Sequence, residues 1–310
     1  MKKDLLSITN LSNEEVLHLI ESAVYLKQRR YVNTLENKTL ALVFEKPSLR
    51  TRLSFELAAK ELGGNAIYLS PAEIGMGQRE PVADVARVLS RFVDIIAART
   101  FSHQTNIDLG KWASVPVINA LDDEEHPCQA LADMLTILEH KGAFKGINIA
   151  YIGDGNNVAT SLMLSASALG ANFRIASPKG YNIKREPWDK GLENAETNNA
   201  ELLWTESTAE AAANADVLYT DVWISMGQEQ ETDRRRKLFK NYQINDRLLR
   251  LAAPDAIIMH PLPAHYGDEV PSGFLDHQQS VAFDQAENRL HVQKAVLLHL
   301  LGALGMGLGA

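Results

Sequence analysis

The chain has 310 residues, of which 45% are hydrophobic and 23% are charged, and it carries a formal net charge of −8 at pH 7. This composition is typical of a globular protein, and the length suits two domains of about 150 residues each. The negative charge argues against nucleic acid as a main partner, because phosphate-backbone binding needs a cationic face. No apolar run reaches the roughly 18 residues that a membrane span requires.

The sequence contains a single cysteine, Cys128. One thiol excludes an intramolecular disulfide and a cysteine-based zinc cluster. The polar start of the chain has no signal-like apolar segment. We therefore expect a cytoplasmic protein.

Helical and strand patterns alternate along the chain. Ser12 and Glu15 have the spacing of a capping box, and a helical period follows them. Short apolar runs predict buried strands near 40–44, 66–69, 95–98, 115–120, 147–152, 173–176, 217–220 and 257–260. This alternation predicts parallel sheets with crossover helices.

The pattern restarts after residues 141–146, which predicts an α/β protein with two doubly wound domains, 1–140 and 141–285. A helix over 127–140 links them. An amphipathic helix over 286–301, within the last segment 286–310, is expected to fold back onto the first domain. Ligands are expected at the carboxyl ends of the strands, in a cleft between the halves.

The segment 44–52 places hydroxyl and guanidinium groups at the start of a helix, directly after a predicted strand. Backbone N–H groups and the positive end of the helix dipole favour an anion there. Ser48 and Thr51 add hydroxyl donors, and Arg50 or Arg52 can bind two phosphate oxygens. The segment predicts a phosphate site, with a plain helix start capped by Ser48 as the alternative.

His126 and Gln129 flank Pro127, which suits the first turn of a helix. The helix dipole disfavours a cationic imidazole, so His126 is suited to donate a hydrogen bond to a carbonyl oxygen. The alternative is a surface or capping histidine. We expect the acidic run before it, 122–125, to be a solvated loop.

The turn 153–158 follows a strand, but Val158 occupies the place of the third glycine of a dinucleotide-binding fingerprint. It predicts a tight turn capped by Asn156 or Asn157, with one amide able to bind a polar substrate group. Asp221 ends another strand, before a small loop with Ser225. Its carboxylate is suited to hold an ammonium group, or alternatively to cap a helix.

Three further features are polar or charged segments outside the motifs above. The basic run 234–237 has acidic neighbours and is expected to form a solvated face. The turn after His260, with two prolines, exposes backbone carbonyls but lacks a third metal ligand, so no metal site is predicted. Arg289 opens the last helix, either as an anion ligand or as a surface charge.

Several groups of residues form a pattern when they are taken together. They are Ser48-Leu49-Arg50-Thr51, Arg99, His126-Pro127-Cys128-Gln129, Asp221 with Ser225-Met226-Gly227, and Glu287-Asn288-Arg289. In this order and spacing they resemble the aspartate/ornithine carbamoyltransferase family across nearly the full chain. The Ser-Met-Gly loop and the Glu-Asn-Arg helix start are more similar to the ornithine enzymes than to the aspartate enzymes.

The resemblance implies transfer of a carbamoyl group from carbamoyl phosphate to ornithine, giving citrulline and phosphate by direct attack of the amine, without a metal or another cofactor. It implies that carbamoyl phosphate is bound by Ser48, Leu49, Arg50, Thr51, Arg99, His126, Gln129, Pro261, Leu262 and Arg289. It implies that ornithine is bound by Asn157, Asp221, Ser225 and Met226. The catalytic residues would be Arg50, Arg99, His126 and Asp221. A homotrimer, or a multiple of trimers, is also implied.

Two positions depart from the family pattern. Pro261 stands where ornithine enzymes commonly have a cysteine, and Gly75 stands where a glutamine or histidine often reaches a neighbouring subunit. The alternatives are therefore a carbamoyltransferase for N-acetylornithine, putrescine or aspartate. An alternative of another class is an inactive module that binds carbamoyl phosphate or an amino acid, which the presence of Arg50, Arg99 and His126 disfavours.

Overall fold

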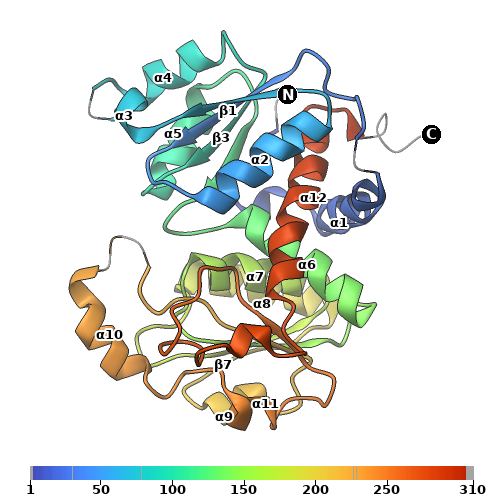
Figure 1. The fold of residues 1–310 in the computed structure, drawn as a ribbon, viewed down its shortest axis with the longest axis vertical. Helices are drawn as coiled ribbons and strands as arrows, with labels where there is room; N and C mark the ends of the chain where they lie inside the picture. Colours follow the sequence, from blue (N-terminus) through green and yellow to red (C-terminus); the bar gives the residue numbers. More distant parts are fainter. Residues whose placement is uncertain (1–2, 30, 78, 226, 228, 305–310) are drawn as a thin grey trace. The chain divides into compact units, whose positions relative to one another are not determined.

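The computed structural model describes residues 3–29, 31–77, 79–225, 227 and 229–304. The chain divides into two compact units, one of Met1–Leu135 with Glu287–Ala310 and one of Thr136–Ala286. Each unit is an α/β body built on one parallel sheet (Figure 1). The expected fold class is confirmed. Within the described ranges, no helix is both long and apolar enough to cross a membrane.

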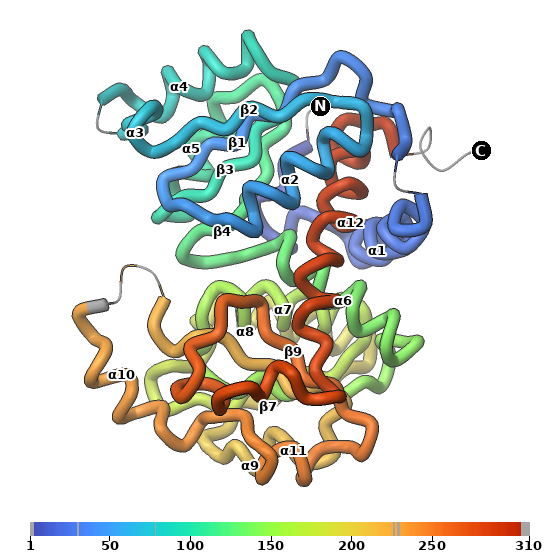
Figure 2. The backbone as a smooth tube through the Cα atoms, viewed as in Figure 1, coloured from blue at the N-terminus to red at the C-terminus, as the bar shows by residue number. Residues whose placement is uncertain are grey.

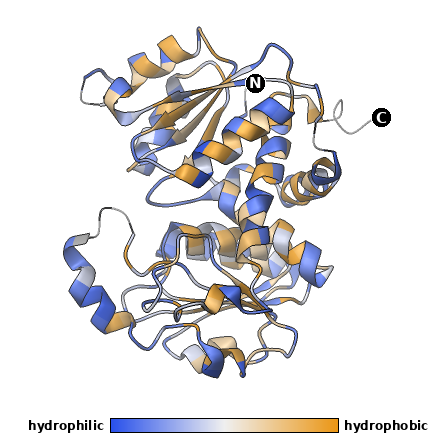
Figure 3. Cartoon of the chain, in the orientation of Figure 1, coloured by the Kyte–Doolittle hydropathy of each residue, from blue (hydrophilic) through white to orange (hydrophobic). Residues whose placement is uncertain are grey.

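The sheet of the first unit has four parallel strands in the order β2-β1-β3-β4. Its strands are β1 (Thr39–Phe44), β2 (Asn65–Leu69), β3 (Ile95–Arg99) and β4 (Val117–Leu121). The four strands predicted for this half are confirmed. Figure 3 shows them coloured mostly hydrophobic, as expected for parallel strands that helices cover on both faces.

The helices of the first unit follow its strands and frame them. They are η1 (Ile8–Asn10), α1 (Asn13–Gln28), α2 (Leu49–Glu61), α3 (Pro71–Ile74), α4 (Val82–Leu89), α5 (His103–Trp112), the first part of α6 (Pro127–Lys141) and most of α12 (Ala282–Leu300). The predicted capping box opens α1. Ser12 Oγ accepts from the Glu15 N–H at 3.2 Å, and the Glu15 carboxylate accepts from the Ser12 N–H at 2.9 Å.

The C-terminal helix α12 packs on the first unit beside α1 and α2, as expected (Figure 2). The buried Lys294 Nζ lies 3.1 Å from Glu61 Oε2 of α2 and donates to the carbonyl of Leu26 in α1. The helix begins at Ala282 rather than at 286. Its first turn includes Phe283, whose residue is 60% exposed, so the apolar period becomes regular only later.

The sheet of the second unit has five parallel strands in the order β7-β6-β5-β8-β9. Its strands are β5 (Asn148–Ile152), β6 (Asn172–Ala176), β7 (Leu202–Thr205), β8 (Val217–Tyr219) and β9 (Ile257–Met259). The sequence did not predict β7. This edge strand has four residues and is only partly buried, and a short apolar run such as Leu202-Leu203-Trp204 does not by itself identify a strand.

The helices of the second unit run between its strands. They are the last part of α6, α7 (Asn157–Ala168), α8 (Arg185–Asn198), α9 (Thr208–Ala212), η2 (Glu229–Glu231), α10 (Thr232–Phe239), α11 (Asp246–Leu249), η3 (Phe274–Asp276) and the first turns of α12.

In both sheets the order of the strands reverses beside the first strand. In the first unit β1 pairs with β2 on one side and β3 on the other, and in the second unit β5 pairs with β6 and β8. Ligands of open α/β sheets bind at the carboxyl ends of the strands at such a switch point. The topology therefore marks one candidate position in each unit.

Candidate functional site

The predicted phosphate turn lies at the switch point of the first unit, between the end of β1 and the start of α2. Ser48 is the N-cap of α2, and its Oγ accepts from the Thr51 N–H at 3.2 Å and donates to Thr51 Oγ1 at 3.0 Å. Leu49 is 76% exposed, so this residue offers the site its backbone N–H rather than its side chain. The turn presents backbone and hydroxyl donors at a helix start.

Arg289 of α12 reaches the same turn. Its Nη2 donates to Thr51 Oγ1 at 2.7 Å, and both residues are buried. Two residues that are 238 positions apart in the sequence therefore meet. Because the Thr51 oxygen already accepts from Arg289 and Ser48, its own hydrogen can be donated to an anion.

Arg99 ends β3, and its register partner is Phe44 at the end of β1. The guanidinium is buried, and its Nε has no hydrogen-bond partner among the described residues. Burial, followed by the positive charges of Arg289 and Arg50, lowers the pKa of Arg99 to about 10. It therefore stays cationic at neutral pH. Clustered buried cations of this kind are typical of an anion-binding site.

Lys46 adds another cation that the sequence did not single out. It is buried, and its Nζ lies 4.9 Å from the centroid of the Phe101 ring. Burial and then the charge of Arg99 lower the pKa of Lys46. Its position two residues after the end of β1 was the available signal, because that is the carboxyl end of a switch-point strand.

His126 and Gln129 lie at the start of α6, in the first unit. Burial, and then the charges of Arg289, Arg99 and Lys46, hold the pKa of His126 well below its ordinary value, so the imidazole is neutral at physiological pH. Gln129 Nε2 donates to Asp133 Oδ1 at 2.8 Å. That bond orients the amide, and Gln129 Oε1 keeps no hydrogen-bond partner within the part of the chain that the structure describes.

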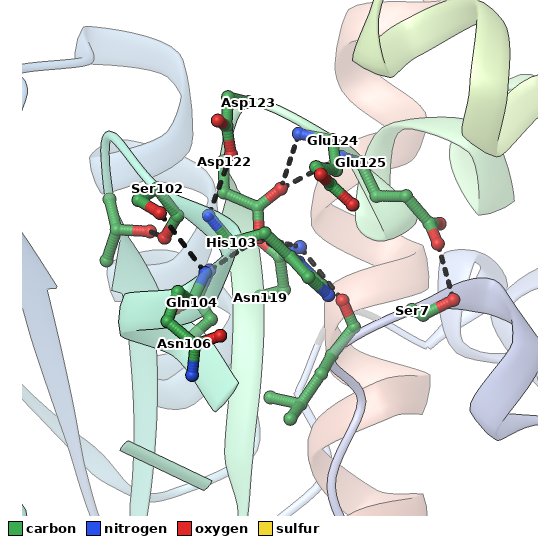
Figure 4. Close-up of polar contacts among 12 residues, drawn as sticks. Ser7, Ser102, His103, Gln104, Asn106, Asn119, Asp122, Asp123, Glu124 and Glu125 are labelled. Carbon is green, nitrogen blue, oxygen red and sulfur yellow. Dashed lines mark hydrogen bonds and ion pairs between the residues drawn. The ribbon is translucent and has the colours of Figure 1, made fainter. Parts of the chain in front are cut away.

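The acidic run before His126 is a buried hub rather than a solvated loop, so that prediction was wrong for Asp122 and Glu125 (Figure 4). Asp122 is fully buried because polar groups surround its carboxylate. It accepts hydrogen bonds from His103 Nδ1 (2.6 Å), Asn106 Nδ2 (2.9 Å), Asn119 Nδ2 (2.8 Å) and the backbone N–H groups of Glu124 and Glu125 (2.9 Å each).

The Asp122 hub also fixes the neighbouring chain. The Glu125 carboxylate accepts from Ser7 Oγ and from the Ile8 N–H, the latter at 3.1 Å. The hydrogen bond to Asp122 raises the pKa of His103 against the effect of its partial burial. Burial alone would raise the pKa of Asp122, but the hydrogen bonds from His103 and Asn106 lower it. The segment that leads into His126 is held from both sides.

In the second unit, Asp221 and the turn after β5 meet at the switch point. Asp221 Oδ2 accepts from Asn156 Nδ2 at 2.8 Å, and Oδ1 accepts from the Val222 N–H at 2.8 Å. Burial raises the pKa of Asp221, while the Asn156 hydrogen bond opposes that shift. Asn156 caps α7, and Asn157 is its first residue. The sequence proposed both asparagines but did not pair Asn156 with Asp221.

Two further predicted amine ligands follow Asp221. Ser225 lies in the segment after Trp223, which is buried in the hydrophobic core of the second unit. Met226 lies outside the described residues.

Pro261 and Leu262 follow β9 in the second unit, whereas the other predicted carbamoyl phosphate ligands belong to the first. The Leu262 N–H donates to His260 Nδ1 at 2.9 Å, and His260 Nε2 donates to Glu269 Oε1 at 3.0 Å. Both ring nitrogens of His260 are thus hydrogen-bonded. The described part of the chain contains no group of three or more His, Cys, Asp or Glu that could hold a metal ion.

The two departures from the family pattern have distinct settings. Gly75 ends α3 with φ 53°, a left-handed conformation that favours glycine over a longer side chain. Cys128 is buried in α6, where burial raises the pKa of its thiol to about 12. It lies in the first unit and Pro261 in the second, and a thiol with this pKa is inert at neutral pH.

The prediction of a solvated face over 234–237 was wrong for Arg235, which is 6% exposed. Its guanidinium forms ion pairs with Asp154 and Glu231. Arg236, in contrast, is exposed and pairs with Asp268 at the surface.

The fold and the two groups of residues define an α/β protein with a cluster of cationic side chains in one unit and a buried, hydrogen-bonded carboxylate in the other. Residues 3–139 match the carbamoyl-P binding domain of the aspartate/ornithine carbamoyltransferase family, and residues 145–300 match its Asp/Orn binding domain. The chain therefore belongs to the aspartate/ornithine carbamoyltransferase family. The resemblance inferred from the motifs is confirmed.

Similar proteins agree with this membership. The ornithine carbamoyltransferase of Pyrococcus abyssi is 49% identical over 313 residues, which cover 98% of each chain. A catabolic ornithine carbamoyltransferase of Thermoplasma acidophilum is 48% identical, over 97% of this chain and 99% of its own. The solved structure of the ornithine carbamoyltransferase from Pyrococcus furiosus has a TM-score of 0.94 at 47% identity, and 97% of each chain is covered.

Proposed function

We propose that this protein is an ornithine carbamoyltransferase, which converts carbamoyl phosphate and L-ornithine into L-citrulline and phosphate. The observation that carries the proposal is the cluster of Arg99, Arg289 and Thr51 beside a neutral His126, within the part that matches a carbamoyl-P binding domain. The ornithine specificity is supported by relatives that bear that name at 49% and 48% identity.

The first substrate would be held by residues 1–140. Ser48, Arg50, Thr51 and the Leu49 N–H would bind the phosphate, because they combine charge-assisted hydrogen bonds with a helix start. Arg99 would bridge the phosphate and the carbonyl oxygen, and Arg289 would add a contact from the last helix. These proposed ligands are hydrogen-bond donors and include no carboxylate, which suits a ligand that carries two negative charges.

The carbamoyl group needs one donor and one acceptor. Neutral His126 would donate to its carbonyl oxygen. Gln129 Oε1 would accept from its amide, because the Gln129 Nε2 is engaged by Asp133 and the oxygen is the end that remains for a ligand. This arrangement would distinguish a carbamoyl group from an acetyl group, since an acetyl group has no N–H to donate.

The second substrate would be held by residues 141–285. Asp221 and Asn157 would hold the charged groups of ornithine, with Ser225 and Met226 beside them. The δ-amine of ornithine resembles that of lysine and is mostly protonated at neutral pH, so its proton must leave before attack. Asp221 would accept it, because burial raises the pKa of this carboxyl. Pro261 and Leu262, which the family resemblance assigns to carbamoyl phosphate, would contribute backbone carbonyls as hydrogen-bond acceptors.

The reaction itself would be a direct displacement. The neutral amine attacks the carbonyl carbon, negative charge grows on the carbonyl oxygen, and the bond to phosphate breaks. Arg99, His126 and Thr51 would stabilise that oxyanion, and Arg50 would take up charge on the leaving phosphate. Positioning of the two substrates supplies much of the remaining rate enhancement.

A different amine is the alternative that one observation favours. Pro261 removes the thiol that ornithine enzymes commonly place near the amine, so N-acetylornithine, putrescine or aspartate would be the acceptor instead. The remaining alternative, an inactive binding module, predicts binding of carbamoyl phosphate without release of phosphate.

One assay separates these possibilities. The purified protein is incubated with carbamoyl phosphate and, in parallel, with ornithine, N-acetylornithine, putrescine or aspartate, while the carbamoylated product and phosphate are both measured. We expect citrulline and phosphate in equal amounts with ornithine. Turnover of another amine alone would refute the ornithine assignment, and carbamoyl phosphate binding without any phosphate release would refute the enzyme. Arg50→Ala serves as the control for activity that depends on the site.

Assembly and location complete the proposal. A homotrimer, or a multiple of trimers, is supported by family membership, and light scattering on the purified protein would test it. A cytoplasmic location is supported by the single, buried cysteine, and fractionation of the host cell would test it.

A further inference from the structure

Arg235 of α10 is a buried cation that the proposed reaction does not use. Its Nη1 donates to Asp154 Oδ2 at 2.6 Å and to the carbonyl oxygen of Trp223 at 3.0 Å, and its Nε donates to Glu231 Oε2 at 3.0 Å. Burial opposes its charge, but the hydrogen bond and charge of Asp154 outweigh that effect and raise the pKa of Arg235. Because the buried guanidinium donates to three acceptors, it restrains the segments of the chain that carry them.

One of those acceptors belongs to the turn after β5. The Asp154 carbonyl accepts from the Asn156 N–H at 2.8 Å, and Asn156 Nδ2 donates to Asp221 Oδ2 at 2.8 Å. The turn has no spare room, because a Cβ at Gly155 would lie 2.3 Å from the Ile183 nitrogen. A displacement of Asp154 is therefore passed on to Asn156 and to the carboxylate that it holds.

Another acceptor belongs to the segment after β8. Trp223 stands between Asp221 and Ser225, and its ring stacks on Phe239 of α10 with centroids 6.0 Å apart. Its carbonyl, bonded to Arg235, is thus fastened to the same helix as its side chain. Arg235 therefore fixes both strand ends that meet at the switch point of the second unit.

We infer that Arg235 is a positioning residue for the amine substrate: by holding Asp154 and the Trp223 carbonyl together, it sets the positions of Asp221 and Ser225. This inference rests on the proposed function, because Asp221 is assigned to the amine there. Arg235 does not touch the substrate in this assignment. It acts on affinity for the amine and leaves the carbamoyl phosphate ligands of the first unit unchanged.

The test compares Arg235→Met, Arg235→Lys and Asp154→Asn with Arg236→Ala, whose exposed ion pair makes it the matched control. KM for ornithine, KM for carbamoyl phosphate, kcat and the melting temperature are measured for each. Arg235→Met is expected to raise KM for ornithine at least tenfold and to change KM for carbamoyl phosphate less than twofold. Arg235→Lys should recover part of the lost affinity for ornithine, because it keeps the positive charge. The recovery should be incomplete, because an ammonium group cannot reproduce the planar fork that reaches both acceptors.

A double variant adds a second test. If Arg235 acts through Asp154, Arg235→Met with Asp154→Asn should raise KM for ornithine by less than the product of the two single effects. An unchanged KM for ornithine, or equal changes in both KM values, would overturn the inference. This holds even if the melting temperature falls, because an ion pair that only stabilises the fold would lower the melting temperature without a selective effect on ornithine. Should Arg235→Met fail to fold, Arg235→Lys and Asp154→Asn decide on the same criterion.

The wild-type protein separates this inference from the proposed function. If it carbamoylates another amine, the proposed function fails, and the KM for that amine takes the place of the KM for ornithine. If it turns over no amine, the affinity for ornithine is measured by calorimetry on the same variants. In either case, loss of amine affinity in Arg235→Met, but not in Arg236→Ala, supports the inference, and equal affinities refute it.

Discussion

The two units place their candidate residues alike but satisfy the charges of those residues in opposite ways. In the first unit, Arg50, Arg99 and Lys46 form no ion pair with any described residue. In the second unit, Asp221 is hydrogen-bonded by Asn156, and Asp154 is paired with Arg235. The charges of the first group are not neutralised by an ion pair among the described residues, whereas those of the second group are held by hydrogen bonds within their own unit.

The difference suggests a division of roles. Repulsion among these neighbouring cations, of which Arg99 and Lys46 are buried, would be relieved by a bound anion, so in the proposed function the first site would convert ligand charge into affinity and transition-state stabilisation. The second site, where hydrogen bonds fix the Asp221 carboxylate, would present that carboxylate to an amine. The following predictions test this contrast, from the largest expected effect to the smallest.

The strongest test is Arg99→Met. If Arg99 stabilises the developing oxyanion, kcat should fall about 10²- to 10³-fold, as for loss of one oxyanion donor. Steady-state rates of citrulline formation measure this loss. Arg87→Met, which removes an exposed arginine of the same unit, is the control. A kcat within threefold of the wild type would place Arg99 outside the reacting centre.

Ligand-induced stabilisation compares the two sites directly. Carbamoyl phosphate at about 100 times its Kd should stabilise the fold by about 2.7 kcal/mol. We expect a clear rise in melting temperature with carbamoyl phosphate alone that high salt weakens, because the site is cationic. A larger shift with ornithine alone would reverse the comparison.

Arg50→Ala should weaken carbamoyl phosphate binding by about 2 kcal/mol or more, through the loss of a charge-assisted contact. Calorimetric titration measures the change, and Arg52→Ala is the control because Arg52 pairs with Glu56 on the exposed face of α2. Unchanged affinity in Arg50→Ala would contradict its assignment to the phosphate.

The Asp122 hub predicts a pH-dependent stability. The pKa of His103 is raised in the folded state. Its contribution to folding stability is therefore fully present below its ordinary pKa and is lost as pH rises through the raised value. The pKa of Asp122 is lowered in the folded state, so its contribution to folding stability is lost only as pH falls through that lowered value. His103→Gln should therefore destabilise the protein more at pH 6 than at pH 9. At pH 6 we expect the free energy of unfolding to fall by about 1.5 kcal/mol.

Thermal unfolding of His103→Gln and of the wild type at both pH values measures this effect. The exposed His18 provides the control variant, His18→Gln. Equal destabilisation at the two pH values would show that the charge of His103 does not contribute.

The smallest expected effect belongs to Lys46. Removal of this charge in Lys46→Met should raise KM for carbamoyl phosphate about fivefold, or about 1 kcal/mol, as expected for a nearby charge that is not a direct ligand. Lys46→Arg, which keeps the charge, should stay close to the wild type. No change in Lys46→Met would remove Lys46 from the anion site.

Much of the fold could be predicted because its signals are local. Continuous apolar runs identified the strands that are covered on both faces, and the side chains of Ser12 and Ser48 cap the helices that follow them, as their spacing predicted. β7 was missed because its apolar run, Leu202-Leu203-Trp204, is short, and a short run is not specific to a strand. The roles of the candidate site residues remain predictions, although the structure brings Thr51 and Arg289 into contact.

The sequence by itself determined the order of the strands and helices apart from β7, the helix start at Ser48 and the family pattern, because each depends on neighbouring residues or on spacing along the chain. Only the tertiary structure decided which charges are buried. Asp122 and Arg235 both lie in charged runs that are typical of solvated loops, yet both are buried. Burial of a charge is stable only where partners surround it, and for Arg235 the partner Asp154 is 81 residues away.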